Sequence, residues 1–221
     1  MHSQEQVTET IAGQGLLPLF YHADSGKSIA VMRALYAAGV RAIEYTNRGA
    51  SAYDNFKLMV EVRNLEMQDL MLGVGTIKTM PDAGKFMDAG ADFLVSPGLV
   101  KNIARFAVIN RFFYAPGCMT PSEINSAENI GIKFIKLFPG NLLGPEFLSS
   151  IREIFPTLHF MPTGGVEPTA ESIGAWFKAG VSAVGMGSKL ISKKLLEAGD
   201  HAAITRSTQE VLEIIRAVKP S

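Results

Sequence analysis

Eight short runs rich in β-branched and aromatic residues recur along this 221-residue chain, with helical patterns in the intervals between them. Most of the runs end in Gly, Pro, Ser or Thr, as strands do when they enter a turn. The predicted strands span residues 16–22, 42–48, 71–77, 93–98, 112–118, 133–139, 159–165 and 183–188. Because strands separated by helices pair in parallel, the pattern predicts an α/β fold built on parallel strands.

The number of strands indicates how the sheet is arranged. Eight strands in about 200 residues suit a closed (β/α)8 TIM barrel. The alternative is an open, doubly wound sheet, which usually has a glycine fingerprint after its first strand, and no such fingerprint follows His22. We therefore predict a single (β/α)8 barrel domain over residues 1–221, with an N-terminal helix over 5–14 that caps the barrel.

A weak internal repeat also favours the barrel. Each copy has a glycine that ends a helix and precedes a strand, and the copies are about two strand–helix units apart. The glycines are Gly39, Gly90, Gly131 and Gly180.

Composition narrows the functional classes. The 21 basic and 21 acidic residues balance, so neither nucleic acid nor an anionic membrane is expected as a partner. No apolar run is long enough to cross a bilayer, and the first residues do not form a signal-peptide pattern. The single cysteine, Cys118, excludes an internal disulfide and favours a reducing compartment. We expect a cytoplasmic protein.

Lys136 is the residue that most directly suggests chemistry. Side chains alternate along a strand, so Lys136 shares a face with Phe134 and Phe138. Ile135 and Leu137 form the opposite, aliphatic face, which suits contact with outer helices. An amine that points into the barrel loses water, which lowers its pKa, and a neutral amine adds to a ketone. Lys136 is therefore predicted to form a Schiff base with a small 2-keto acid, rather than to reach solvent from an edge strand.

Two charged residues lie on one face of the predicted strand 42–48. Glu44 points inward and can move the protons that imine formation and aldol cleavage require. Arg48, at the carboxyl end of the strand, suits a two-pronged contact with a substrate carboxylate. The alternative is a structural ion pair of Glu44 with Arg48 or Lys136.

Glycine-rich turns end the last two predicted strands. Barrels often bind phosphate there through exposed backbone N–H groups, although ordinary turns also contain glycine. The candidate phosphate-binding residues are Gly164, Gly165, Gly187 and Ser188. Lys189 either adds charge to this site or is a solvated helix residue. No His, Cys or carboxylate spacing indicates a metal site, and no histidine near Cys118 in sequence indicates a thiol nucleophile.

In this order and combination, several segments resemble the 2-keto-3-deoxy-6-phosphogluconate and 4-hydroxy-2-oxoglutarate aldolase family over nearly the whole chain. The segments are 39–48, Gly-Val-Gly-Thr at 73–76, 96–98, 116–117, 134–139 and 162–165. The resemblance implies a class I aldolase that uses neither a metal nor another cofactor, that is usually trimeric and that acts on a small, phosphorylated 2-keto acid. The family's Schiff-base lysine falls on Lys136 and its acid/base glutamate on Glu44.

The resemblance also assigns the substrate contacts. They fall on Arg48, Thr76, Pro97, Phe138 and Thr163, and the phosphate site falls on Gly164, Gly165, Gly187 and Ser188. Two departures concern the substrate. Residues 44–49 read Glu-Tyr-Thr-Asn-Arg-Gly where better-known members carry Glu-Val-Thr-Leu-Arg-Thr, and residues 140–141 read Gly-Asn where they carry Ala-Glu.

We therefore expect cleavage of 2-keto-3-deoxy-6-phosphogluconate to pyruvate and glyceraldehyde 3-phosphate through a lysine Schiff base. Cleavage of 4-hydroxy-2-oxoglutarate or 2-keto-3-deoxy-6-phosphogalactonate is the alternative, because the sequence does not identify the substrate tail or the stereochemistry at C4. A phosphosugar epimerase or isomerase and a non-catalytic phosphometabolite-binding barrel are more remote alternatives.

Overall fold

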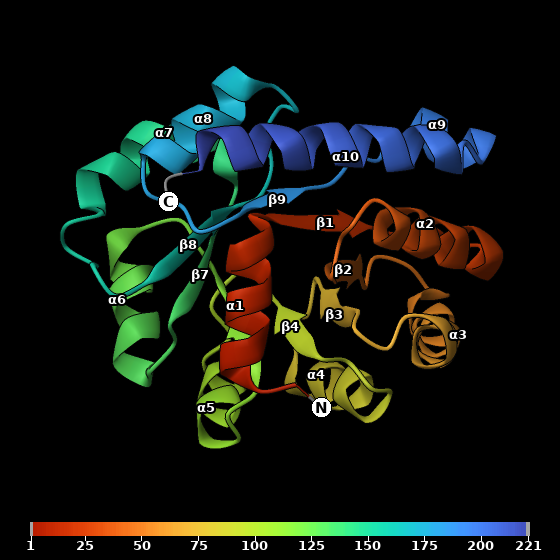
Figure 1. Ribbon diagram of the computed structural model, residues 1–221. Helices are drawn as coiled ribbons and strands as arrows, with labels where there is room; N and C mark the ends of the chain where they lie inside the picture. Colours follow the sequence, from red (N-terminus) through yellow and green to blue (C-terminus); the bar gives the residue numbers. More distant parts are fainter. Residues whose placement is uncertain (1, 220–221) are drawn as a thin grey trace.

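The computed structural model describes residues 2–219, and its strands lie at the centre with most of the helices around them (Figure 1). The strands are β1 (Leu16–Phe20), β2 (Ala42–Thr46), β3 (Met71–Gly75), β4 (Phe93–Val95), β5 (Phe113–Ala115), β6 (Gly117–Cys118), β7 (Phe134–Leu137), β8 (His159–Pro162) and β9 (Val184–Met186). The helices are α1 (Gln4–Gln14), α2 (Ser25–Ala37), α3 (Ala52–Glu66), α4 (Met80–Asp88), α5 (Lys101–Ile109), α6 (Pro121–Ile130), α7 (Gly140–Ile151), α8 (Ala170–Lys178), α9 (Lys193–Ala198) and α10 (His201–Val218).

Strand pairing confirms the predicted parallel α/β fold. A six-stranded sheet has the order β5-β4-β3-β2-β1-β9, a three-stranded sheet has the order β6-β7-β8, and every pairing is parallel. A single parallel bridge between Thr163 and Gly185 links the end of β8 with β9. Each predicted strand is present, and the fifth is divided into β5 and β6 at Pro116, which has no N–H for the ladder.

The strands are shorter than predicted at their carboxyl ends. For example, β2 ends at Thr46 rather than at 48, and β8 ends at Pro162 rather than at 165. The residues beyond these ends form loops that carry most of the predicted substrate contacts. These contacts therefore lie in loops rather than in the regular strands.

The two faces of the strands pack into separate apolar clusters. Ile135 and Leu137 of β7 belong to the larger cluster, together with residues of the surrounding helices, as the alternation predicted. Phe134 belongs to the smaller cluster, where it packs with strand residues and with Val7 and Ile11 of α1. This burial places α1 against the strands themselves, and Figure 1 shows it lying across them.

Helix α1 agrees with the predicted N-terminal helix over 5–14. Ser3 and Gln6 form a capping box at its start, and Gly15, with φ 70°, ends it in the left-handed region. At the other end of the chain, α10 packs against α2 and α8. No helix in the described part, α10 included, is both long and apolar enough to cross a membrane.

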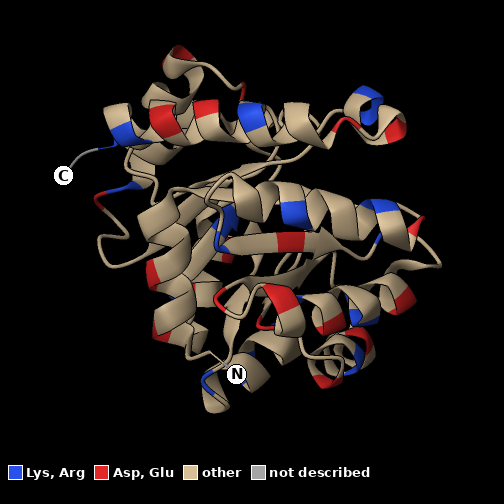
Figure 2. Ribbon diagram, turned by 45° about the vertical axis from the view of Figure 1, so that its right-hand side comes forward, with Lys and Arg blue, Asp and Glu red and all other residues tan. Residues whose placement is uncertain are grey.

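Charged residues of both signs occur along the outer helices (Figure 2). This distribution agrees with the balanced composition of 21 basic and 21 acidic residues. Buried charges are few, and two of them, Glu44 and Lys136, lie on the strands.

Candidate functional site

A lysine–glutamate pair lies between β7 and β2. Lys136 of β7 and Glu44 of β2 are both buried, and the lysine Nζ lies 3.9 Å from Oε1 of Glu44. Both carboxylate oxygens of Glu44 are buried and accept no hydrogen bond from the described residues. A buried carboxylate without such partners is costly and marks a functional site more often than a structural one.

The surroundings of Lys136 favour its neutral form. Burial lowers the pKa of the amine, the nearby Glu44 opposes this effect, and Arg48 adds to it. The Nζ atom also lies 5.1 Å from the centre of the Phe138 ring. The predicted direction of the pKa shift is therefore confirmed, and its largest cause is the loss of water.

Glycines of β3 make room for the buried side chains. A Cβ atom on Gly75 would overlap the carboxylate of Glu44, and one on Gly73 would overlap the ring of Phe93. Protein side chains fill the space that these glycines leave, and Gly75 lets Glu44 lie where it does.

Arg48 and Thr76 come together at the ends of β2 and β3. The Nε atom of Arg48 donates to Oγ1 of Thr76 at 3.4 Å, and the N–H of Asn47 donates to the carbonyl of Gly75 at 2.9 Å. Thr76 has φ 62°, a conformation that costs energy for a β-branched residue and that clusters at functional sites. Arg48 is exposed, so its guanidinium can reach a ligand at the mouth of the site.

Most of the other predicted site residues line one cavity of about 180 Å³. Its predicted members are Arg48, Phe138, Thr163, Gly164, Gly165, Gly187 and Ser188. Gly164 and Gly165 have φ 93° and 75°, a conformation that requires glycine in this turn. The hydroxyl oxygen of Thr163 is buried and has no hydrogen-bond partner in the described structure.

Among the predicted substrate contacts, Pro97 stands apart. Arg48, Phe138 and Thr163 line this cavity and Thr76 bonds to Arg48, whereas Pro97 does neither. It follows β4, and a Cβ atom on Gly117 would overlap its carbonyl. Lys189, whose role the sequence left open, does line the cavity. Its Nζ lies 2.7 Å from Oε1 of Glu167, so its charge is already paired.

The sequence interpretation missed the contribution of β1. Leu19 of β1 lines the 180 Å³ cavity, and the residues after β1 line a neighbouring cavity of about 450 Å³. The sequence could have indicated this contribution. The carboxyl ends of parallel strands lie at one edge of the sheet, so the end of the predicted strand 16–22 lies at the same edge as the other site residues.

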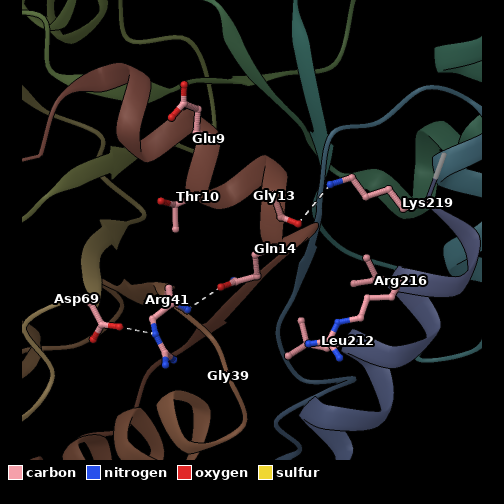
Figure 3. Close-up of a pocket in the computed structure, with 11 residues that line it drawn as sticks. Glu9, Thr10, Gly13, Gln14, Gly39, Arg41, Asp69, Leu212, Arg216 and Lys219 are labelled. Carbon is pink, nitrogen blue, oxygen red and sulfur yellow. Dashed lines mark hydrogen bonds and ion pairs between the residues drawn. The ribbon is translucent and has the colours of Figure 1, made fainter. Parts of the chain in front are cut away.

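A further cavity of about 490 Å³ lies between α1 and α10 at the opposite ends of the strands (Figure 3). Three of its charged groups, Arg41, Asp69 and Lys219, have partners in the protein. Nε of Arg41 lies 2.7 Å from Oδ2 of Asp69, and Nζ of Lys219 donates to the carbonyl of Gly13 at 3.3 Å. These contacts indicate a structural role at the amino ends of the strands.

Cys118 does not belong to the site chemistry. The thiol is buried in the larger apolar cluster, and burial raises its pKa to about 12. A thiol with this pKa stays protonated at neutral pH, which argues against a nucleophile. Within residues 2–219, no three His, Cys, Asp or Glu side chains gather as a metal ion would require.

A parallel α/β fold with a buried lysine–carboxylate pair defines the class, and comparison with known proteins identifies it as that of the aldolases, which are lyases. The chain belongs to the KDPG and KHG aldolase family, which it matches over residues 7–207. The family predicted from the sequence motifs is therefore confirmed, as is its assignment to the lyases.

Individual relatives agree with this membership. The chain is 32% identical to the KHG/KDPG aldolase of Escherichia coli K12 over 84% of its own length and 85% of that protein. It is 31% identical to the 2-dehydro-3-deoxy-phosphogluconate aldolase of Pseudomonas aeruginosa over 96% of both chains. The solved structure of the 2-keto-3-deoxy-6-phosphogluconate aldolase of Zymomonas mobilis superposes with a TM-score of 0.82 at 25% identity, covering 100% of this chain and 99% of that one.

Proposed function

We propose that this aldolase cleaves 2-keto-3-deoxy-6-phosphogluconate to pyruvate and glyceraldehyde 3-phosphate through a Schiff base on Lys136. The proposal rests on one observation: Lys136 and Glu44 are both buried, with 3.9 Å between Nζ and Oε1. The names of the Pseudomonas aeruginosa and Zymomonas mobilis relatives support the same substrate.

In this mechanism the neutral amine of Lys136 adds to the C2 ketone, and Glu44 moves the protons that accompany loss of water. The resulting iminium accepts the electron pair of the C3–C4 bond as that bond breaks. Glu44 takes the proton of the C4 hydroxyl, so the tail leaves as an aldehyde and an enamine remains. Protonation of the enamine at C3 and addition of water to the imine release pyruvate and restore the amine.

The other site residues have roles at the two ends of the substrate. Arg48 and Thr76 suit the substrate carboxylate next to the ketone, because the Arg48 guanidinium and the Thr76 hydroxyl are in contact and both can bind one carboxylate. Pro97, Phe138 and Thr163 would contact the chain of the substrate. The turns at Gly164, Gly165, Gly187 and Ser188 suit the phosphate, since they line the same cavity as Arg48.

A second substrate, 4-hydroxy-2-oxoglutarate, is supported by the name of the Escherichia coli relative, which carries both activities. The same pair would cleave it to pyruvate and glyoxylate. Pyruvate release from both substrates and from 2-keto-3-deoxy-6-phosphogalactonate, measured side by side, separates these alternatives.

Reduction of the enzyme with borohydride in the presence of pyruvate tests the mechanism. We expect mass spectrometry to locate a pyruvate-derived adduct on Lys136. The matched variants are Lys136→Ala, which should form no adduct, and Lys133→Ala, which removes an exposed lysine from the start of the same segment and should behave as the wild type. A wild-type enzyme that turns over substrate without forming the adduct would exclude the imine.

We also propose that the two sheets form one closed (β/α)8 barrel and that the chain is a single domain. Pro116 alone separates β5 from β6, and the bridge between Thr163 and Gly185 links β8 to β9. Helix α1 would then cap the end at which the strands begin. A crystal structure with an open gap between β8 and β9 would contradict the closure.

We propose a homotrimer as the assembly. Several large apolar side chains are exposed on the described surface, and subunit contacts would cover them. They are Leu58, Leu65, Ile109, Met119, Leu142 and Ile154. Light scattering should give the mass of three chains, and a monomer at micromolar concentration would contradict the proposal.

A cytoplasmic location is the last part of the proposal. The balanced charge and the single, buried Cys118 support it. Cell fractionation tests it, and recovery of the protein outside the cytoplasm would contradict it.

A further inference from the structure

A second cavity adjoins the site from the side of β1. It has a volume of about 450 Å³ and lies between the end of β1, the end of β2 and helix α9. It shares Leu19, Arg48, Gly187 and Ser188 with the 180 Å³ cavity. The turn at Gly187 and Ser188 therefore borders both cavities.

The loop after β1 is held in place by buried polar groups that the proposed mechanism does not use. The backbone carbonyl of His22 accepts hydrogen bonds from Tyr45 Oη at 2.9 Å and Asn55 Nδ2 at 3.0 Å. Ser28 Oγ lies 3.1 Å from the same carbonyl and 2.9 Å from the carbonyl of Asp24, and its single proton goes to one of the two. Tyr45, Asn55 and Ser28 are all buried. These contacts fix the backbone of His22 at the cavity wall, as a preorganised binding site requires.

The ring of His22 is oriented as well. The N–H of Asp24 donates to Nδ1 of His22 at 2.9 Å. A backbone N–H can only donate, so Nδ1 is the acceptor and Nε2 carries the proton of the neutral ring. His22 lines the cavity and therefore offers it a donor.

The charges around this cavity favour an anion. Arg48, Lys193 and Glu197 are its charged residues. The carboxylate of Glu197 lies 3.5 Å from Nζ of Lys27, which offsets its charge. Lys193 forms no salt bridge within residues 2–219, so the positive charge of the cavity is in excess.

We propose that His22 and Lys193 complete the subsite for the anionic tail of the substrate. They contact its phosphate from the side of β1 and α9, while the turns at Gly164 and Gly187 contact it from the other side. This inference deepens the proposed function and rests on it for the identity of the substrate. Neither residue belongs to the segments that carry the family resemblance, so the proposal rests on the cavity and its charges.

Titration calorimetry with inorganic phosphate tests the subsite independently of the imine chemistry. We expect His22→Ala and Lys193→Ala each to weaken phosphate binding by about tenfold, as loss of a hydrogen bond to a charged group does. Lys194→Ala removes the next lysine of α9, which does not line the cavity, and should change affinity by less than about twofold. Lys193→Arg keeps the charge and should retain most of the affinity.

Steady-state kinetics supply the second measurement. His22→Ala and Lys193→Ala should raise KM for 2-keto-3-deoxy-6-phosphogluconate by a similar factor and leave KM for its unphosphorylated analogue unchanged. Phosphate affinity and KM that match the wild type in both variants would overturn the inference. If the wild type forms no pyruvate adduct while phosphate binding still depends on His22 and Lys193, the proposed function fails and the anion subsite stands.

Discussion

The Nζ atom of Lys136 lies 3.9 Å from Oε1 of Glu44, and neither side chain exposes more than 4% of its surface. The separation is too long for a hydrogen bond, yet short enough for the charge of one group to affect the protonation of the other. An amine that is only weakly tied to its carboxylate is available to a ketone.

The first prediction concerns pH. Burial lowers the pKa of Lys136 from its ordinary 10.5, and an amine is neutral above its pKa. The rate of pyruvate adduct formation should therefore rise with pH with a midpoint below pH 10.5. Mass spectrometry after timed reduction measures this rate, and a midpoint at or above the ordinary value would contradict the assignment.

Glu44→Gln should shift that midpoint further down. The negative charge of Glu44 raises the pKa of Lys136, so its removal leaves burial and Arg48 to lower the pKa unopposed. The same timed reduction measures the shift. An upward shift would mean that the carboxylate does not act on Lys136 through its charge.

Turnover by Glu44→Gln should also fall, by about 10²–10⁴-fold in kcat, because a group that transfers protons is lost. KM should change far less, since the amide occupies the same space. Glu61→Gln, on the exposed face of α3, is the matched control and should keep wild-type kinetics. An effect confined to KM would indicate that Glu44 binds substrate without moving protons.

Gly75→Ala should damage the site without touching a substrate. The added methyl group overlaps the carboxylate of Glu44, so the carboxylate must move. We expect a loss of about 1–3 kcal/mol in the free energy of unfolding and a fall in kcat. Denaturant unfolding and steady-state kinetics measure the two effects.

Gly84→Ala in α4 is the control for this substitution, because nothing lies within 4 Å of its added Cβ. It should leave kcat unchanged and stabilise the protein by up to about 1 kcal/mol through helix propensity. If Gly75→Ala keeps wild-type kcat, the position of Glu44 does not depend on that glycine.

Cys118 should resist alkylation in the folded protein. Burial raises the pKa of its thiol to about 12, so thiolate is scarce at pH 8 and reagent has little access. Iodoacetamide followed by mass spectrometry should show modification only after unfolding in guanidinium. Rapid modification accompanied by loss of activity would show a reactive thiol near the site.

Much of the fold was predictable because its signals are local. Apolar runs and helix-ending glycines located the strands and helices, and alternation placed Ile135 and Leu137 against the helices. The carboxyl ends of the strands were not predictable, since the ladder of hydrogen bonds, rather than residue type, decides where a strand ends. The division at Pro116 could have been foreseen from its missing N–H.

The site was predictable in its residue types and less so in its contacts. Alternation indicated that Lys136 and Glu44 point inward, but their distance depends on strand pairing between distant segments. The same limit applies to Gly75 of the adjacent strand β3. It pairs with Thr46, two residues after Glu44, and the Glu44 carboxylate lies over it. The ion pair of Lys189 with Glu167 could likewise not be predicted from the pattern of residues within one segment.

The strands end before the substrate-contacting loops begin, and this has an evolutionary consequence. Lys136 and Glu44 lie within β7 and β2, whereas Arg48, Gly164 and His22 lie beyond strand ends. Loop residues tolerate exchange more readily than residues in a packed sheet. If the proposed roles hold, mutation of these loops changes which aldehyde the enzyme releases while the buried pair is kept, and new substrates become accessible without a new catalyst.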